Sequence, residues 1–411
     1  MELDRSDAAL LAEEGRLSLD DPVRRWVPEL PGYTDRVSIR HLVHHTSGIR
    51  DYLGLWGLSG RSFADEIPEE VGLDLIARQA ALDFEPGARW SYSNSGYLLL
   101  SEIVKRASGK SLRQYTTERM FQPLGMGDTH FHDDNAMVVP RRAEGYQPVG
   151  PGQYQIVRTS FALVGDGGLM TTVEDLAKWE QNFRDNRLGR GGPSLIDQVT
   201  TVGHTNDGKP LDYAFGLTRG SHRGLATIAH GGAFIGFRAQ MIRFPDARFA
   251  VTVLCNDYTA NPDQLARRVA ELYLADRLAP AGSRTAASGG VSVSAVRLQQ
   301  WVGSYRLSPG AIGRVTRDSA GLVLAAFGAR ARMVPVSDSV FTAVPLSGEV
   351  IYRTSAAGPA ILVAGIGMTE PSPRLPPPPR LTAALVAGYA GRYRSEELDT
   401  WAGWWKLGAI P

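Results

Sequence analysis

The 411-residue sequence predicts an α+β fold, in which one large mixed domain is followed by β-rich sequence. Helical periodicity dominates the first half of the chain, short strand-like runs follow it, and a further helical stretch comes before residue 278. Gly109 and Thr172 support two helix boundaries, because glycine commonly follows a helix and threonine commonly caps one. The expected helices cover residues 8–17, 38–44, 73–81, 96–108 and 262–277, and a further helix follows the cap at Thr172 within residues 169–183.

The predicted sheet lies in the second half of this domain. Runs rich in β-branched, aromatic and aliphatic residues cover 226–230, 236–244 and 248–256. The pairs Gly231-Gly232 and Pro245-Asp246 separate these runs. This pattern predicts an antiparallel meander with breaks at the two pairs.

The rest of the chain divides by composition. A small-residue, glycine-rich linker leads into alternating sequence, and a proline-rich stretch has six prolines in nine residues, which predicts an extended spacer. The hexapeptide that starts at Trp301 is echoed by the one that starts at Tyr389, which predicts two copies of a small β module. The predicted parts are a domain over 1–278, a linker over 279–296, a β module over 297–370, a spacer over 371–380 and a partial second module over 381–411.

Composition excludes several classes of function. Lysine plus arginine total 44 and aspartate plus glutamate total 43, so no basic face for a nucleic-acid partner is expected. The single cysteine, Cys255, excludes an internal disulfide framework and a cysteine-rich metal site. No apolar run is long enough for a membrane span, and the first residues are polar, without the apolar core of a signal peptide. As written, the sequence predicts a soluble protein, cytoplasmic by default.

Two short elements carry the candidate chemistry. The first is Trp90-Ser91-Tyr92-Ser93-Asn94-Ser95-Gly96-Tyr97, directly before an expected helix. A tyrosine beside a lysine can hold a lowered pKa and shuttle a proton, and an asparagine amide can hold a lysine and a substrate amide together. The second is His230-Gly231-Gly232, where glycine would let a strand edge approach a substrate closely and histidine would offer a hydrogen-bond donor.

These elements, with five framework segments in a characteristic order, resemble the serine β-lactamase and penicillin-binding-protein superfamily. The closest resemblance is to its branch of class C β-lactamases, D-alanyl-D-alanine carboxypeptidases and esterases. It covers about residues 8–278, and the sequence after it is similar to the lipocalin-like modules appended to this branch. The framework segments are Leu17-Ser18-Leu19-Asp20-Asp21-Pro22, His45-Thr46-Ser47-Gly48-Ile49, Phe84-Glu85-Pro86-Gly87, Pro123-Leu124-Gly125-Met126 and Gly165-Asp166-Gly167-Gly168-Leu169.

The resemblance implies a β-lactamase/transpeptidase-like fold and a serine hydrolase that acts through an acyl-enzyme. The substrate would be a β-lactam, a D-amino-acid peptide or a small ester, and no metal or organic cofactor would be needed. Tyr92 would relay protons, Asn94 would position lysine and substrate, and His230 with Gly231 and Gly232 would line the substrate edge. Complete relatives would be exported to the periplasm or the cell exterior. The oligomeric state stays open.

The nucleophile expected from the resemblance is missing. No Ser-x-x-Lys occurs in the 411 residues, and the family spacing would put that serine just before Met1 and the lysine near Met1. Ser6 lies nearest, but Ala9 stands where its lysine should be. Ser47 and Ser93 are poor substitutes, and the nearness of His44, His45 and Asp51 in sequence does not make a triad.

Two alternatives remain. The chain could be a non-catalytic homologue that binds peptide or cell-wall fragments, or an inactive truncated product.

The histidines His41, His44 and His45 could share a helix face as metal ligands, but no third ligand of acidic or cysteine type has diagnostic spacing. We therefore predict structural roles for them and no metal site.

Overall fold

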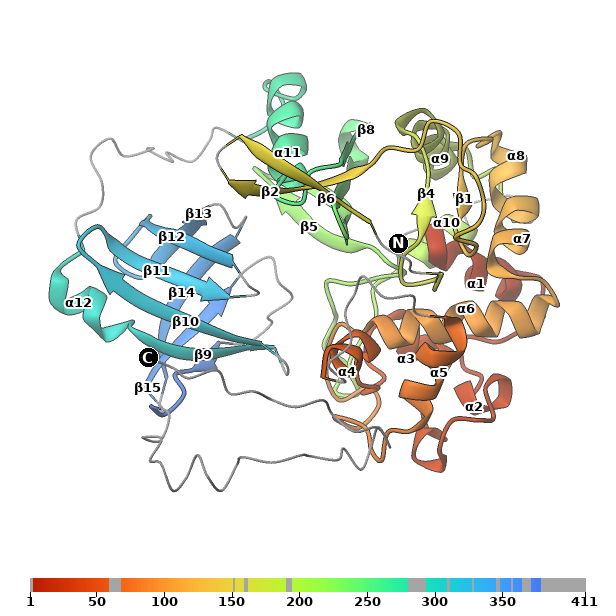
Figure 1. The fold of residues 1–411 in the computed structure, drawn as a ribbon, viewed down its shortest axis with the longest axis horizontal. Coiled ribbons are helices and arrows are strands. Elements are labelled where there is room, and N and C mark those ends of the chain that lie inside the picture. The colour runs from red at the N-terminus through yellow and green to blue at the C-terminus, as the bar shows by residue number, and fades with distance from the viewer. Residues whose placement is uncertain are drawn as a thin grey trace. The chain divides into compact units, whose positions relative to one another are not determined.

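A computed structural model describes most of the chain, and its residues form two compact units (Figure 1). The first unit takes in the described residues up to Leu278, and the second takes in those from Ala279 onward. The described residues are 3–58, 68–150, 152–158, 162–189, 194–279, 293–308, 311–326, 329–344, 348–355, 358–363 and 371–377.

The helical part of the first unit is built around α6 (Asn94–Ser108), in which every residue from Ser95 to Val104 is buried. A helix that is buried on all sides belongs to a core, and six other helices pack against this one. It ends at Gly109, which adopts the left-handed conformation with φ 71°, as predicted. The helices around it are α1 (Leu3–Glu13), α2 (Val23–Trp26), α3 (Ile39–Val43), α4 (Tyr52–Leu58), α5 (Glu69–Ala77) and α7 (Leu112–Thr116).

Some helix boundaries differ from the predicted ones. Helix α5 begins directly after Pro68, with Glu69 and Glu70 in its first turn, and so starts earlier than expected. After α7 the chain continues through η2 (Thr117–Phe121) and α8 (Gln122–Leu124), and an earlier short turn, η1 (Gly32–Thr34), follows α2. Helix α9 (Val173–Asp185) is capped by the Thr172 side chain, which accepts from the Asp175 backbone N–H, as predicted.

The main sheet of the first unit contains the antiparallel meander predicted for residues 226–256, preceded by one strand that was not predicted. Its order is β5 (Thr218–His222), β6 (Leu225–Phe234), β7 (Phe237–Phe244) and β8 (Phe249–Cys255). Helix α11 (Pro262–Tyr273) covers β7 and β8 and buries Ala266 and Ala270 against Ile242 and Phe244. A short turn, η3 (Pro245–Ala247), joins β7 to β8, and α10 (Ser194–Thr200) packs on α1.

One predicted break in the sheet is wrong. Gly231 and Gly232 lie inside β6, which continues to Phe234. The turn to β7 falls at Gly236, whose φ is +78° and whose Cα packs so closely on Gly145 that a side chain would not fit. The glycine pair therefore lies within a strand and not in a turn.

Two small sheets were not predicted. Strand β1 (His130–Phe131) pairs with β4 (Leu169–Met170), and β2 (Gly145–Gly150) pairs with β3 (Gln153–Val157). The strands of the first pair have two residues each, too few to show an alternating pattern in sequence. The antiparallel sheets and flanking helices of the described residues confirm the predicted α+β class.

The second unit is an antiparallel sheet in which each strand pairs with the next in sequence. A bridge from Tyr305 to Arg374 and a hydrogen bond from Leu375 N–H to Ser304 O (2.7 Å) join its last residues to its first strand, so the sheet closes on itself. Its elements are α12 (Ala295–Gln300), β9 (Gly303–Ser308), β10 (Ala311–Asp318), β11 (Gly321–Ala326), β12 (Ala329–Pro335), β13 (Val340–Val344), β14 (Gly348–Ser355), β15 (Gly358–Val363) and β16 (Ser372–Pro373).

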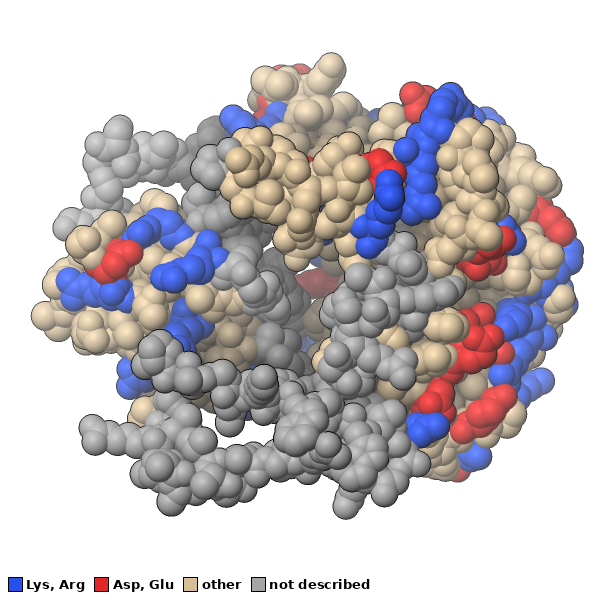
Figure 2. All heavy atoms as spheres, in the orientation of Figure 1, with Lys and Arg blue, Asp and Glu red and all other residues tan. Residues whose placement is uncertain are grey.

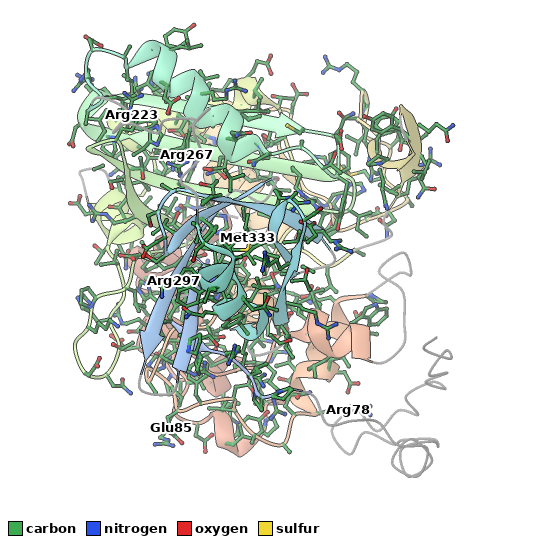
Figure 3. The ribbon with its side chains drawn as sticks, turned by 90° about the vertical axis from the view of Figure 1, so that its left-hand side faces the viewer. Arg78, Glu85, Arg223, Arg267, Arg297 and Met333 are labelled. Atoms are coloured by element: carbon green, nitrogen blue, oxygen red, sulfur yellow. The ribbon has the colours of Figure 1, made fainter. Side chains whose placement is uncertain are left out.

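This closed sheet has its own core. Trp301 stacks on Tyr352 with ring centroids 4.3 Å apart, and Met333, labelled in Figure 3, is buried in the same cluster. The guanidinium of Arg297, also labelled there, lies over the Trp301 ring. The sequence suggested a spacer from residue 371, but β16 pairs with β15, so this part of the proline-rich stretch belongs to the sheet. The second copy of the repeat lies outside the described residues, and the likeness to lipocalin modules and the domain boundaries stay predictions.

Charged side chains of both signs are interspersed on the face of the first unit that Figure 2 presents. Many are paired, as Arg106 is with Glu29 (2.9 Å) and with Glu102 (2.5 Å). This mixing agrees with the near-zero net charge of +1. None of the helices among the described residues is long and apolar enough to cross a membrane.

The turn at Gly48 provides a test of the framework. Gly48 has φ +75°, and a Cβ there would lie 2.1 Å from the backbone oxygen of Phe84. We expect Gly48→Ala to lower the free energy of unfolding by roughly 3 kcal/mol, from backbone strain and overpacking together. Gly54→Ala is the matched control, because Gly54 lies in α4 with no atom within 4 Å of its Cβ position. It is expected to stabilise the helix by about 0.5–1 kcal/mol. Urea unfolding of both variants checks this, and equal effects would contradict it.

Candidate active site

Asn94 is the first residue of α6, and Tyr92 lies two residues before it in an extended segment. The backbone N–H and the side-chain amide of Asn94 both donate to Oδ2 of Asp51, at 2.6 and 2.7 Å. Because a carboxylate only accepts, the Asn94 amide nitrogen must face Asp51. Its oxygen then faces the other way, as an acceptor.

Asp51 is a structural anchor that the sequence analysis did not identify. Its Oδ1 accepts from the backbone N–H of Leu53 at 2.9 Å, so one carboxylate ties the start of α4 to the start of α6. Negative charge at two helix N-termini is favourable, because both present unpaired N–H groups there. The hydrogen bonds of Asp51 are with these helix ends, which agrees with the rejection of an Asp51 triad.

Tyr92 is partly buried, and its ring packs on the imidazole of His45 with centroids 4.2 Å apart. His45 is 2% exposed and stacks on Tyr97 at 4.5 Å. Nδ1 of His45 lies 3.2 Å from the Ser93 backbone nitrogen, and its Nε2 lies 3.2 Å from Oη of Tyr213. His45 is thus enclosed by the segment that carries Tyr92.

His230 lies on β6 and reaches the same group of side chains. Its Nε2 is 3.1 Å from Oη of Tyr213, and its Nδ1 is 2.6 Å from the carbonyl oxygen of Gly231. Tyr92 and His230 are therefore brought together through His45 and Tyr213. Both ring nitrogens of His230 have partners within the protein, whereas the sequence analysis expected a donor directed at substrate.

Gly231 and Gly232 lie where β6 loses one neighbour. Strand β5 pairs with β6 only as far as Ala229, whereas β7 pairs with it to Phe234. From His230 to Phe234, β6 therefore has a partner strand on one side only among the described residues. An edge of this kind can accept an extended peptide. Glycine has no side chain, so it lets the peptide backbone approach the strand closely.

The loop around Asp166 packs against both α6 and β6, which carry Asn94 and His230. Asp166 accepts a hydrogen bond from the Tyr52 hydroxyl at 2.6 Å, and burial together with the Asp166 charge raises the pKa of Tyr52. A Cβ on Gly165 would strike Ser101 of α6, and the Gly167 position lies against Phe234 at the end of β6. The glycines of this framework segment thus allow the loop to pack between α6 and β6.

The other candidate histidines have structural surroundings. His41 forms a capping box with Ser38 at the start of α3. His44 packs edge-on against Phe215, and burial lowers its pKa to about 4. His41, His44 and His204 help to line a pocket of about 340 Å³. Within the part of the chain that the structure describes, no cluster of three histidine, cysteine or acidic residues is arranged to hold a metal.

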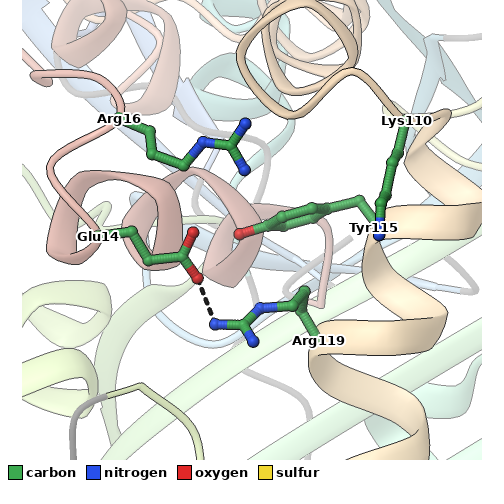
Figure 4. A pocket seen from close by; sticks show the side chains of 5 residues that line it. All are labelled: Glu14, Arg16, Lys110, Tyr115 and Arg119. Atoms are coloured by element: carbon green, nitrogen blue, oxygen red, sulfur yellow. Dashed lines mark hydrogen bonds and ion pairs between the residues drawn. The ribbon is translucent and has the colours of Figure 1, made fainter.

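A second pocket, of about 280 Å³, lies between the end of α1 and helix α7 with η2 (Figure 4). Figure 4 shows the ion pair between Glu14 and Arg119, with the Tyr115 hydroxyl pointing between them and Arg16. Neither pocket is lined by Tyr92, Asn94 or His230.

The serines near the site that could replace the nucleophile are all buried. Ser6 is buried in α1, and Ser47 accepts from the Ile49 backbone N–H. Ser95 accepts from the Tyr52 N–H at 2.8 Å and donates to the Arg50 carbonyl at 2.6 Å. Ser93 is 5% exposed, with its hydroxyl buried.

Comparison with known proteins identifies the family. Residues 8–276 match the family described as Beta-lactamase. The chain belongs to the Beta-lactamase family. This match confirms the resemblance and the fold expected from the sequence.

Relatives in this family agree with the assignment. The chain is 28% identical over 363 residues to penicillin-binding protein 4* of Bacillus subtilis (strain 168), covering 84% of this chain and 78% of that one. It is 29% identical over 382 residues to a D-aminopeptidase of Cereibacter sphaeroides (strain ATCC 17023), covering 92% and 69%. The octameric penicillin-binding protein homologue from Pyrococcus abyssi has a similar fold, with a TM-score of 0.59, 22% identity and coverage of 90% and 86%.

Two residues at the centre of the site, His45 and Tyr213, were missed in the sequence analysis. His45 was treated as part of a framework turn, although its position in His-Thr-Ser-Gly was a usable signal. Tyr213 lies outside the sequence motifs described above. Its hydrogen-bond partner His45 is 168 residues away in sequence, so only the folded chain brings them together.

Proposed function

We propose that this member of the Beta-lactamase family has the framework of a serine hydrolase. The enzyme would cleave amide bonds next to D-amino-acid residues through an acyl-enzyme. The observation that supports it best is the connection of Tyr92, at the start of α6, to His230, at the half-open end of β6, through His45 and Tyr213. One wall carries a proton-transfer tyrosine and the other a strand edge for an extended substrate.

The reaction needs a serine and a lysine on the residues that would lead into α1. Tyr92, with that lysine, would take the serine proton and return it to the leaving amine. The Asn94 oxygen, turned away from Asp51, suits a bond from the lysine ammonium, because the ammonium only donates. The β6 edge beside Gly231 and Gly232 would hold the substrate backbone.

The preference for D-residues is supported by the likeness to a D-aminopeptidase over 92% of this chain. β-Lactams and small esters are the other substrates that the same chemistry would serve. The second candidate function, a non-catalytic protein that binds peptide, shares the strand edge and lacks the proton transfer.

The test uses the chain joined to an upstream segment that carries Ser-x-x-Lys, in register with α1 so that the lysine falls near position 1. We expect this protein to hydrolyse D-alanine p-nitroanilide at least tenfold faster than the L-isomer. A serine-to-alanine change in the added segment is the control for background hydrolysis. Equal rates for the two isomers would overturn the D-preference. Binding of D-alanyl-D-alanine without turnover of any amide, ester or β-lactam would support the non-catalytic alternative.

A further inference from the structure

His45 has an unusual backbone for a buried side chain. Its φ is +55°, a left-handed conformation that costs energy for a residue other than glycine. The surroundings hold it there: its N–H bonds to the Leu42 carbonyl at 3.2 Å, and its carbonyl accepts from Ser91 N–H at 2.8 Å. Such outliers persist where the surroundings over-determine them and are concentrated at functional sites. This backbone conformation places the His45 imidazole between the rings of Tyr92 and Tyr213.

The partners of the two imidazoles set the direction of each hydrogen bond. The Ser93 backbone N–H can only donate, so Nδ1 of His45 carries no hydrogen, and its Nε2–H donates to Oη of Tyr213. The Gly231 carbonyl can only accept, so Nδ1 of His230 carries the hydrogen. In a neutral imidazole Nε2 of His230 is then an acceptor, and it takes the hydroxyl hydrogen of Tyr213.

Tyr97 lies beside this chain of hydrogen bonds and not within it. Its hydroxyl donates to the Val43 carbonyl at 3.1 Å, and its oxygen is 3.2 Å from Oη of Tyr213. If His230 takes up a second proton, its Nε2–H can donate to Tyr213, whose own hydrogen then turns to Tyr97. Uptake of a proton by His230 would thus be accompanied by rotation of the Tyr213 hydroxyl hydrogen from His230 to Tyr97.

We propose that His45 and Tyr213 are positioning residues of the site. They form one directed chain, from the Ser93 N–H through His45 and Tyr213 to His230, which together with the Gly231 carbonyl holds the tautomer and ring orientation of His230. The same His45 ring packs on Tyr92, so both walls of the site are aligned through one imidazole. This inference rests on the proposed function for its catalytic meaning, but the hydrogen-bond chain can be measured without turnover.

The first test is long-range ¹H–¹⁵N NMR of the histidine-labelled 411-residue chain, at a pH above the ordinary histidine pKa of about 6.5. The sequence has eight histidines, and the signals of His45 and His230 are assigned by their loss in His45→Asn and His230→Asn. We expect an Nε2–H tautomer for His45 and an Nδ1–H tautomer for His230, because the tautomer follows the bond made by the other nitrogen. The opposite tautomer at either residue would overturn the inference.

Tyr213→Phe tests the link itself. It keeps the ring and removes the hydroxyl, so His230 loses one of the two hydrogen bonds that hold its tautomer and keeps only the one to the Gly231 carbonyl. We therefore expect the ¹⁵N shifts of His230 to move toward those of a tautomer mixture. Tyr97→Phe is the matched control: it removes a hydroxyl from the same cluster without cutting the chain, and should leave both tautomers unchanged. Unchanged His230 shifts in a folded Tyr213→Phe protein would contradict the proposal.

A kinetic arm separates this inference from the proposed function. In the chain extended with Ser-x-x-Lys, Tyr213→Phe is expected to lower kcat tenfold to a hundredfold, whereas Tyr97→Phe should have little effect. An extended protein that shows the expected tautomers but hydrolyses no amide would refute the proposed function and leave the positioning roles standing. If the extended protein is active and Tyr213→Phe changes neither its kcat nor its His230 signals, the positioning roles alone would be refuted.

Discussion

A polypeptide of these 411 residues is expected to remain unlabelled by a fluorescent fluorophosphonate or penicillin. No serine in the sequence has a lysine three residues later, so no hydroxyl is activated from the next helical turn. Loss of the nucleophile in such a system costs on the order of a million-fold in rate. In-gel fluorescence after incubation with the probe measures the result.

The matched experiment adds Ser-x-x-Lys in register with α1, and labelling should then appear. Tyr92→Phe in this extended protein should abolish labelling if Tyr92 relays the proton, or slow it if lysine alone suffices. Stoichiometric labelling of the unextended polypeptide, mapped by mass spectrometry to Ser6, Ser47, Ser93 or another serine, would show that the site has been assigned wrongly.

Arg243→Met is expected to lower the free energy of unfolding by about 3–5 kcal/mol, because it removes the positive charge that pairs with a poorly solvated carboxylate. Arg243 on β7 has a side chain that is 6% exposed, and Glu180 on α9 is 13% exposed. Their atoms pair at 2.7 Å (Nε to Oε2), and the guanidinium lies 3.7 Å from the centroid of the Phe183 ring. The pair therefore joins the sheet to a helix in a poorly solvated place.

Two comparisons show whether burial is the cause. The double variant Arg243→Met with Glu180→Leu should recover most of the loss, because no charge is left unpaired. Arg267→Met is the control for a more exposed pair, since Arg267 (labelled in Figure 3) bonds to Asp263 within α11 with about a third of each side chain exposed. Its expected cost is about 0.5 kcal/mol. Similar losses for Arg243→Met and Arg267→Met in chemical unfolding would contradict the argument.

Local signals in the sequence were sufficient for much of the fold. Gly109 ends α6 and Thr172 caps α9 where expected, because helix ends are specified by nearby residues. The meander β6–β8 was predicted from strand-like runs, which also depend on neighbours in sequence. Strands β1 and β4 were not, because two-residue strands have no pattern and their pairing joins distant segments.

The residues of the site also fall into two groups, those that short sequence elements indicated and those that only the folded chain revealed. Tyr92, Asn94 and His230 could be selected as candidates because each lies in a short element with recognisable neighbours. Asp51 and Tyr213 have no such neighbours, and His45 lies in a segment that was taken as framework. The hydrogen bonds that join Asp51 to Asn94 and His45 to Tyr213 span 43 and 168 residues. The position of Gly231 and Gly232 inside β6 was misjudged, because a glycine pair in sequence has the same appearance in a turn and in a flat strand.

By itself, the sequence determined the α+β class, the family and three candidate residues, since periodicity, caps and short motifs are local properties. Only the tertiary structure decided what those residues contact. It turned the Asn94 amide toward Asp51, gave both nitrogens of His230 protein partners, and connected His230 to Tyr92 through Tyr213 and the left-handed His45. The physical reason is that the direction of a hydrogen bond is set by what its partner can donate or accept, and here the partners come from distant parts of the chain.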